Sequence, residues 1–530
     1  MASTSSLWYG NYRGAVYPVD LHAPPIDLGP RARRMKTLVE LCAEEIVKDS
    51  GLTRAAISII PKPLCEPLMK EALYRNREMA IRCIVGSWPT EVLLLRHMVP
   101  QLFTSVQTLY NMAYQSDIVK QGLRYTTSLA HTFLDALKNN SDTKLRFLDL
   151  TGFPSAEVIV YFLATHCMLA HNEMRHQTIR NMYEQAVQQA GSQVVSEIEP
   201  MEPMEHSLPE ECSVTIKLDA FVTSESTHTE LCKALKVSSF PNRKLSIVLS
   251  RLSMTCLGQA RISLLLKQLQ PQQLTGLQLQ YNALTAQDFV KLAPALQTLV
   301  SVESLDLSCN SIFFCQNEAC CNATALVFGA MPRLQRLDLS NNRIKTRLRR
   351  LLEKIALPLT YLRLAGCGLT VTDMTYLAQS QHCANLVELD LSENNLSLCD
   401  RQFRDVVTAA RSSMCVLEIE DCTLNTANVH SFLPCLAQLS SLMYLNVAEN
   451  RLPQNSQVTL LVTAAELVTL QVFKSSYALE CYDFEGEEER LKAAALAELN
   501  LMANRSSVQS LRPKPLALFL TELERVLDSS

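Results

Sequence analysis

The sequence predicts an α/β solenoid in which a parallel sheet lines the concave side and helices cover the outside, preceded by an N-terminal helical cap region. The pattern Leu-x-x-Leu-x-Leu-x-x-Asn/Cys-x-Leu recurs seven times between Leu274 and Leu452, in steps of 25 to 32 residues. Of the 530 residues 48% are hydrophobic, which is enough to bury a continuous core. These observations indicate a leucine-rich repeat horseshoe of the ribonuclease-inhibitor-like kind, because repeats longer than about 25 residues leave room for a full outer helix.

Each repeat is predicted to contain a strand, a turn and a helix. The Leu-x-Leu pair forms a short strand with alternate side chains pointing inward. The Asn side chain that follows can bond to backbone groups at the turn, and Cys367 and Cys422 take its place in two repeats. Helical stretches such as 372–381 and 403–412 then return the chain to the next strand.

Composition and periodicity divide the chain into six segments. The runs 145–150 and 245–249 read as further repeat strands, and residues 515–527 are predicted to form a final helix that caps the array. Residues 197–211 hold six acids and no Lys or Arg, which is typical of disorder. The predicted segments are a disordered tail (1–34), a helical N-terminal region (35–137), a first repeat-like segment (138–187), an acidic disordered insertion (188–212), the leucine-rich repeats (213–475) and a C-terminal capping region (476–530).

Charge and hydropathy exclude several classes of partner. The formal net charge of −4 gives no electrostatic footprint for a nucleic acid. The longest apolar run, 158–170, is interrupted by Thr165 and His166 and is too short for a bilayer span, so no membrane is expected either. No secretory signal follows Met1. We therefore expect a cytoplasmic protein, with the weakly basic run 31–36 leaving a nuclear location open.

Signatures of catalysis, cofactors and metals are missing from the sequence. No Gly-x-Ser-x-Gly, Gly-Lys-Ser/Thr or His-Glu-x-x-His motif occurs. Cys315, Cys320 and Cys321 lie close together but lack a second pair at metal spacing, so we expect thiols. The sequence therefore predicts a protein that is not an enzyme, with no catalytic residue, cofactor or metal.

A helical stripe lies near the N-terminus. Leu38, Cys42 and Ile46 follow Thr37 at intervals of four, so they line one side of a helix and can enter the groove of a partner. The alternative is that the stripe is the helix's own core contact. A second pattern, Ile-Pro-x-x-Leu-x-x-x-Leu over residues 60–68, begins another helix, where Pro is tolerated.

Together these patterns resemble an elongin-C-binding box followed by a cullin-2 box. The residues implied are Thr37, Leu38, Cys42 and Ile46 for elongin C and Ile60, Pro61, Leu64 and Leu68 for the cullin. A cullin-2 box usually begins with Leu, where this chain has Ile60. Pro63 adds a faint resemblance to cullin-5 receptors, but Lys62 stands where those have an apolar residue, so cullin-2 is favoured.

A wider resemblance supports this interpretation. The runs 38–46, 57–72 and 85–89, the stretch 358–392 and residues 480–482 are similar to the PRAME family, and within it to the branch of leucine-rich repeat-containing proteins 14 and 14B. The family resemblance implies a substrate-recognition subunit of a cullin-2 RING ubiquitin ligase with elongin B/C as adaptor. The branch implies restraint of NF-κB signalling through an inhibitor-of-κB kinase subunit, a role that no identified residue carries.

The hollow of the predicted horseshoe is the expected client-binding surface, because the positions flanking each buried Leu pair face it. Those from Glu388 to Asp421 are acidic, so a basic or polar client with the tyrosines as anchors is expected. Solubility is an alternative explanation for Asp306, Asp338 and Asp390. The predicted client-binding residues are Tyr281, Arg336, Tyr361, Arg363, Glu388, Asp390, Glu393, Glu418, Glu420, Asp421, Tyr444 and Asn446.

The sequence thus leaves two hypotheses. In the favoured one, a non-catalytic adaptor binds elongin B/C and cullin-2 through the N-terminal patterns and holds a client in the hollow for ubiquitin transfer. In the other, a scaffold or inhibitor occupies a signalling protein through the hollow and never engages a cullin. The stripe at Leu38 would then be buried in the protein's own fold, so its exposure separates the two hypotheses.

Overall fold

The computed structural model describes residues 36–75, 77–98, 129–134, 144–151, 157–172, 214–239, 244–482 and 517–520. The predicted tail 1–34 and the predicted acidic insertion 188–212 lie outside these residues. Contacts divide the chain into two compact units, one ending at Leu274 and the other beginning at Thr275. This boundary falls inside the region 213–475 that the sequence assigns to the repeats.

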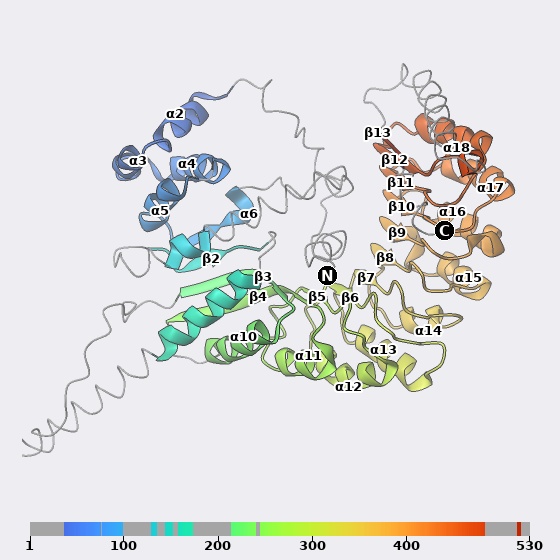
Figure 1. Cartoon of the computed structure of the whole chain (residues 1–530), viewed down its shortest axis with the longest axis horizontal. Coiled ribbons are helices and arrows are strands. Elements are labelled where there is room, and N and C mark those ends of the chain that lie inside the picture. The colour runs from blue at the N-terminus through green and yellow to red at the C-terminus, as the bar shows by residue number, and fades with distance from the viewer. Residues whose placement is uncertain are drawn as a thin grey trace, which may run out of the picture. The chain divides into compact units, whose positions relative to one another are not determined.

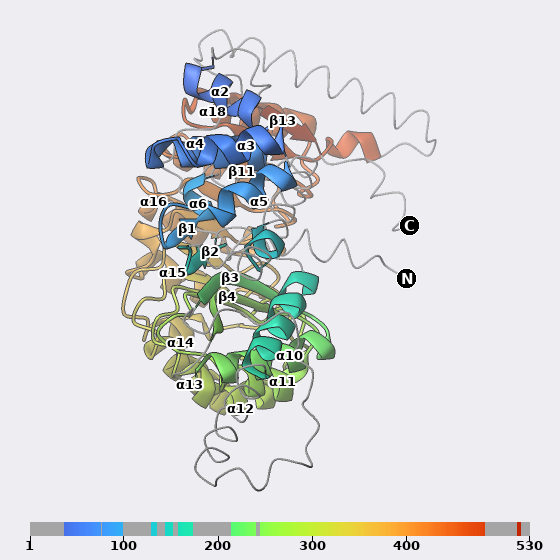
Figure 2. The same ribbon diagram turned by 90° about the vertical axis from the view of Figure 1, so that its left-hand side faces the viewer.

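The first unit contains a group of short helices, visible in Figure 2. They are α2 (Leu38–Ile46), α3 (Ser50–Ile57), α4 (Lys62–Tyr74), α5 (Glu78–Gly86) and α6 (Leu95–Met98). Local signals start them: the Asp49 carboxylate accepts from the Leu52 N–H at 2.7 Å at the start of α3, and Pro61 precedes α4. Cys65, Met69 and Ala72 of α4 are buried, so this helix contributes to the core of the first unit.

A parallel sheet and further helices also belong to the first unit. Its strands follow chain order: β1 (Val92–Leu94), β2 (Phe147–Asp149), β3 (Val214–Val222) and β4 (Leu245–Met254). Helices α10 (Glu225–Ser238) and α11 (Gly258–Leu266) follow β3 and β4. The strands predicted at 145–150 and 245–249 are therefore confirmed as β2 and the first half of β4.

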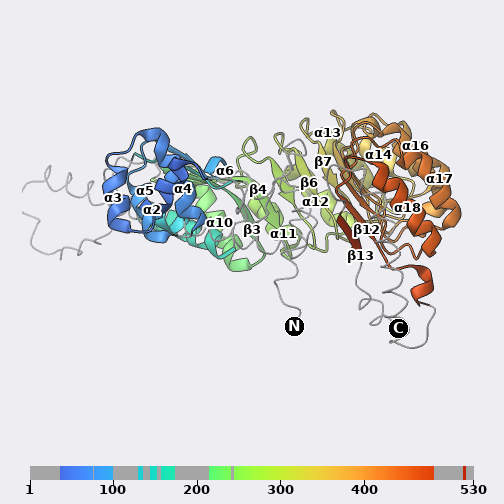
Figure 3. The ribbon, with the colours of Figure 1, turned by 90° about the horizontal axis from the view of Figure 1, so that it is seen from above.

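The second unit is a leucine-rich repeat solenoid with a parallel sheet in chain order, as the sequence predicts. In Figures 1 and 3 its helices lie outside its strands. The strands are β5 (Gly276–Gln278), β6 (Ser304–Asp306), β7 (Arg336–Asp338), β8 (Tyr361–Arg363), β9 (Glu388–Asp390), β10 (Val416–Glu418), β11 (Tyr444–Asn446), β12 (Val472–Ser475) and β13 (Ala517–Leu520). The helices are α12 (Ala286–Leu296), α13 (Glu318–Gly329), α14 (Leu348–Leu352), α15 (Val371–Gln379), α16 (Asp400–Ala409), α17 (Thr426–Leu436) and α18 (Gln454–Glu466), with short 3₁₀ turns η2 (Cys383–Asn385), η3 (Leu396–Cys399) and η4 (Leu479–Tyr482).

A ladder of asparagines joins neighbouring repeats, as the turn chemistry predicts. The Asn310 Nδ2 donates to the Leu279 and Leu307 carbonyls, both at 2.9 Å, so one side chain satisfies two repeats. Cys367 and Cys422 do replace Asn: their Sγ atoms lie 3.3 Å from the carbonyl oxygens of the preceding repeats. Burial raises the pKa of both thiols, so they keep the proton that they donate.

The C-terminal prediction is wrong at one point. Where a capping helix was predicted at 515–527, Ala517–Leu520 forms strand β13, which pairs in parallel with β12. A short apolar run fits a strand or a helix equally well by periodicity. A strand is favoured over a helix here, because the peptide groups at the open edge of β12 need hydrogen-bond partners. Among the helices that the structure describes, each is too short or too polar to cross a bilayer.

Candidate functional site

The predicted stripe on α2 is open to solvent. Leu38 is 76% exposed, Cys42 is exposed and Ile46 is half-buried. The helix contacts its own unit through Ala43, while Val47 is buried just after the helix ends. The alternative that Leu38 and Cys42 form the helix's own core contact is therefore excluded for these two residues.

Thr37 orders this helix without using the stripe. Its hydroxyl accepts from the Glu40 N–H at 3.2 Å, and its own N–H donates to the Glu40 carboxylate at 2.8 Å, which is a complete capping box. The Thr at the start of the motif therefore has a role within the helix itself. It fixes the first turn, on which Leu38 lies.

Ion pairs tie α2 to α4. Glu44 contacts Lys36 and lies 2.5 Å from Arg75, whose Nε also contacts Glu71 at 2.6 Å. The hydrogen bond from Lys36, helped by the charge of Arg75, holds the pKa of the Glu44 carboxyl below its usual value. These contacts turn the face of α2 that carries Glu44 toward α4, so the opposite face stays free.

The cullin-box residues divide between surface and core. Pro61 is exposed, Ile60 is half-buried and Leu64 is partly exposed. Leu68, however, is only 2% exposed, because it lies on the face of α4 that packs into the core of the first unit. Its prediction as a partner contact is wrong for this conformation, and its role is to hold the helix in place.

Sequence reasoning missed Ile59, which is 81% exposed at the turn before α4. The motif aligns Ile60 instead, and two adjacent isoleucines give no sequence signal for which one faces solvent. The turn places Ile59 outward, so the exposed apolar surface next to Pro61 comes from Ile59 and Leu64.

Sheet register brings the predicted client-binding residues together. Arg336, Tyr361 and Glu388 are register partners on β7, β8 and β9. Two residues further along, Arg363 lies between Asp338 and Asp390, and Glu418 is the next partner. Most of the predicted set is buried or half-buried, while Tyr281, Glu393 and Asp421 are exposed.

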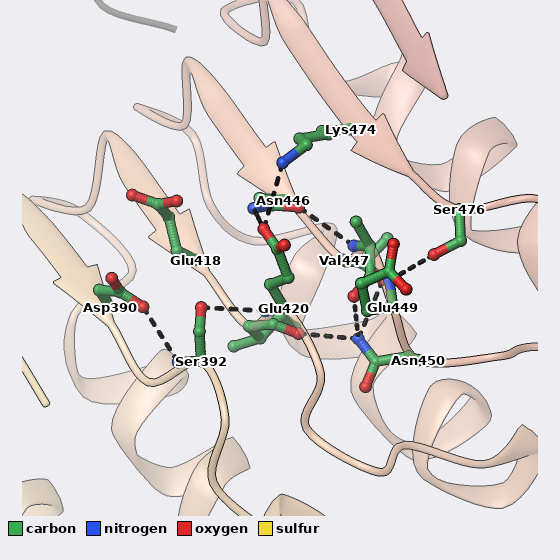
Figure 4. Close-up of polar contacts among 12 residues, drawn as sticks. Asp390, Ser392, Glu418, Glu420, Asn446, Val447, Glu449, Asn450, Lys474 and Ser476 are labelled. Atoms are coloured by element: carbon green, nitrogen blue, oxygen red, sulfur yellow. Dashed lines mark hydrogen bonds and ion pairs between the residues drawn. The ribbon is translucent and has the colours of Figure 1, made fainter. Parts of the chain in front are cut away.

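The acidic half of this surface is partly neutralised by its own bases. Arg363 lies 2.9 Å from Glu418 and 3.9 Å from Asp390, and Arg336 lies 3.9 Å from Glu388. Figure 4 shows Glu420 held by the Asn446 amide at 2.6 Å and by Lys474 at 3.2 Å. The predicted free acidic patch is therefore smaller than the sequence suggests.

Lys474 is a second residue that sequence reasoning missed. It occupies in β12 the register position that Glu418 and Asn446 occupy in β10 and β11. The signal is faint, because β12 follows the last full repeat and carries Val-Phe-Lys instead of the Leu-x-Leu pattern. Counting 28 residues on from Asn446 finds it.

Two exposed acids and one half-buried acid share one special position. Glu393, Asp421 and Glu449 each precede the Asn or Cys of the ladder and have φ values of 57°, 50° and 59°. Tyr281 occupies the same position at 55°. The left-handed conformation is therefore common to this turn position in four repeats.

Burial changes the electrostatics around Tyr361. The guanidinium of Arg336 lies 4.3 Å from the centre of the Tyr361 ring, and that of Arg363 lies at 5.5 Å. Burial, together with the charge of Asp306, raises the pKa of Asp338 to about 7. Burial also raises the pKa of Glu388, an effect that Arg336 and Arg363 oppose. The centre of the concave sheet is thus a desolvated network of charges.

The sequence matches a known protein family. Residues 243–521, just over half of the chain, match the family profile of the PRAME C-terminal domain. The chain belongs to the PRAME family. As a PRAME-family protein it has a leucine-rich repeat fold of the kind used for protein interaction, and the family resemblance seen in the sequence is confirmed.

Relatives of this PRAME-family chain extend the match over most of its length. It is 26% identical over 479 residues to leucine-rich repeat-containing protein 14 of Xenopus laevis, which covers 84% of this chain and 89% of that protein. The proteins of the same name from Mus musculus and Homo sapiens are 24% and 23% identical, each over 85% of this chain and 88% of theirs. Among solved structures, the leucine-rich repeat-containing protein LegL7 of Legionella pneumophila is 17% identical, covers 52% of this chain and 84% of that chain, and has a TM-score of 0.35.

Proposed function

We propose that this PRAME-family protein is the non-catalytic substrate-recognition subunit of a cullin-2 RING ubiquitin ligase. The observation that carries the proposal is the exposure of Leu38 and Cys42 on a helix that is ordered by other residues. An isolated exposed leucine is ordinary. An exposed stripe that matches a partner motif and has no role in the fold favours a docking function.

In this proposal each part of the chain has one task. Leu38, Cys42 and Ile46 enter a groove of elongin C, and the turn at Ile59 to Leu64 selects cullin-2. The concave sheet of the second unit holds a client protein for ubiquitin transfer. Catalysis and any cofactor belong to other subunits, and the protein acts in the cytoplasm.

A pull-down with tagged full-length protein tests the proposal. We expect wild type to recover elongin B/C and cullin-2, and Leu38→Ala/Cys42→Ala to lose most of both, because burying a leucine side chain contributes about 1.5–3 kcal/mol. Leu52→Ala is the control, since Leu52 is an exposed leucine as well, at 49%, but lies on α3, outside both motifs. Equal recovery from wild type and the double variant, or recovery of neither partner by wild type, contradicts the proposal.

The same experiment addresses the cullin and the alternative function. Recovery of cullin-5 in place of cullin-2 reassigns the ligase. The alternative proposal is a scaffold that binds an inhibitor-of-κB kinase subunit and restrains NF-κB signalling without a cullin. Recovery of that kinase subunit by wild type and the double variant alike, with no elongin B/C, supports this alternative.

A further inference from the structure

Acids outnumber bases on the central concave strands of the second unit. Strands β6 to β10, all within the described residues, carry five acids and two arginines on this face. We name these residues with Tyr361 the Tyr361 cluster: Asp306, Asp338, Glu388, Asp390, Glu418, Arg336 and Arg363. The cluster is therefore negative when all of its carboxyls are ionised.

Two buried acceptors in the cluster have nothing to accept. Tyr361 is 0% exposed, and within the described part of the chain its hydroxyl has no hydrogen-bond partner. Glu388 is 5% exposed, and its Oε1 likewise has no partner among the described residues. The two residues are register partners on β8 and β9, so their polar ends lie on the same face at adjacent strands. Buried polar atoms are nearly always satisfied in native proteins, and such a pair points to a ligand.

Arg336 does not fill this need. Its Nη2 lies 3.9 Å from Glu388, too far for a hydrogen bond, and its Nε has no hydrogen-bond partner among the described residues. Its guanidinium rests on the Tyr361 ring at 4.3 Å. A side chain held by stacking and a long ion pair can swing aside when a better partner arrives.

We propose that the Tyr361 cluster binds a lysine or arginine side chain of the client, with Glu388 Oε1 and the Tyr361 hydroxyl accepting its N–H groups. This site rests on the proposed function, because it assumes that the concave sheet holds a client. A bound cation supplies positive charge where acids are in excess. The client's main-chain carbonyl next to the basic residue accepts from Arg336, whose Nε and Nη2 have no hydrogen-bond partner among the described residues.

The protonation of the empty cluster is consistent with this site. Burial and the charge of Asp306 raise the pKa of Asp338 to about 7, and burial raises the pKa of Asp390, an effect that Arg363 opposes. Protons thus partly offset the excess of acids when no cation is bound. An anionic client group at Glu388 meets the charges of Glu388 itself and of Glu418 on the neighbouring strand β10, and is disfavoured.

A peptide-binding assay with the full-length protein tests the site. The probe is a fluorescein-labelled hexa-arginine peptide, and hexa-citrulline, its neutral isostere, is the peptide control. We expect hexa-arginine to bind and Glu388→Gln to weaken it by about tenfold or more, since a charged hydrogen-bond partner is lost. Asp405→Asn is the matched control: it removes the same charge from the exposed side of α16, the outer helix of the same repeat, and is expected to change affinity less than about twofold.

Tyr361→Phe separates binding from folding. The Tyr361 hydroxyl has no partner among the described residues, so its removal is expected to leave the thermal midpoint unchanged or higher. It is expected to weaken hexa-arginine binding by about three- to tenfold. A role for the hydroxyl in the fold alone predicts the reverse, a lower midpoint with unchanged affinity.

Several results overturn the inference. The first is equal loss of affinity in Glu388→Gln and Asp405→Asn, which means diffuse attraction. The others are equal binding of the arginine and citrulline peptides, and no binding by wild type. Recovery of elongin B/C by the same variants is measured in parallel. Unchanged recovery with no peptide discrimination removes this site and leaves the ligase proposal intact, whereas peptide discrimination without elongin B/C recovery does the opposite.

Discussion

Replacing Asn310 by alanine tests whether the asparagine ladder stabilises the second unit. The Asn310 Nδ2 donates to the Leu279 and Leu307 carbonyls at 2.9 Å, and its Oδ1 accepts from the N–H groups of Asn282 at 3.1 Å and Leu284 at 3.2 Å. Alanine removes these four hydrogen bonds and a fifth one, from Nδ2 to the Ser308 carbonyl at 3.1 Å. The backbone groups concerned are buried inside the turn, where water cannot replace the lost amide.

The size of the effect follows from these contacts. Each buried polar group left without a partner costs about 1–3 kcal/mol, and relaxation recovers part of the sum, so we expect Asn310→Ala to lower the free energy of unfolding by about 3–5 kcal/mol. Asn310→Cys is expected to cost about half as much, since a thiol can still act as a weak donor and acceptor. The chain itself uses Cys367 and Cys422 at this position, with sulphur–oxygen distances of 3.3 Å.

Urea denaturation followed by circular dichroism gives the loss in stability, and hydrogen exchange at the Asn282 and Leu284 amides localises it. Asn385→Ala is the control, because Asn385 is exposed and its loss is expected to change stability by less than about 0.5 kcal/mol. The ladder argument is refuted if Asn310→Ala and Asn310→Cys are equally destabilising, or if exchange at Asn282 and Leu284 does not accelerate.

Four further predictions follow from the contacts described above. Arg363→Met is expected to lower the free energy of unfolding, measured by urea denaturation, by about 3–5 kcal/mol, because it leaves the Glu418 and Asp390 carboxylates buried without the cation that pairs with them. Adding Glu418→Gln should recover part of the loss, and no recovery contradicts the pairing. Leu68→Ala is expected to lower the free energy of unfolding by about 2–5 kcal/mol. Ile59→Ala should change it by less than about 0.5 kcal/mol and should reduce cullin recovery in pull-downs. A larger loss of stability in Ile59→Ala than in Leu68→Ala would show that Ile59 is the core residue. The pKa of Asp338 is raised to about 7 in the fold, so between about pH 4 and 7 the folded state holds a proton that the unfolded state has released. The free energy of unfolding should therefore fall as pH rises through this range, by about 1.4 kcal/mol per pH unit at most. Asp338→Asn should flatten this slope in denaturation at several pH values, and an unchanged slope rejects the raised pKa. Glu44→Gln weakens the ties from Lys36 and Arg75, so it should lower elongin B/C recovery in pull-downs without altering Leu38 itself, while Glu45→Gln, on the exposed side of α2, should not.

The repeated part of the fold was predictable because its physics is local. Leu277, Leu305 and their equivalents alternate with polar residues, and a strand with one buried face admits only one register. The turn asparagine satisfies backbone groups within a few residues and in the adjacent repeat, so spacing alone locates it. The same holds for the substitution of Cys at 367 and 422.

The electrostatics of the concave surface were not predictable in the same way. Glu420 is held by Lys474, 54 residues further along, from a strand that lacks the repeat pattern. Whether Glu388 is free or paired depends on the lateral neighbours that register assigns, and the sequence at one repeat does not contain them. The basic client stays a prediction, and the atoms that point to it are the Tyr361 hydroxyl and Glu388 Oε1, which have no hydrogen-bond partner among the described residues, in place of a broad acidic patch.

In the N-terminal motifs the sequence pattern does not predict which residues are exposed. Leu38 and Leu68 occupy equally conspicuous positions in their motifs, yet one is 76% and the other 2% exposed. On α4 the core claims the face that bears Leu68, whereas on α2 the capping box of Thr37 and the ion pairs of Glu44 already fix the helix. Leu38 and Cys42 thus add nothing that the fold needs and leave apolar surface in water. A partner that covers Leu38 and Cys42 removes this apolar surface from water, and for this reason we propose that α2 binds elongin C.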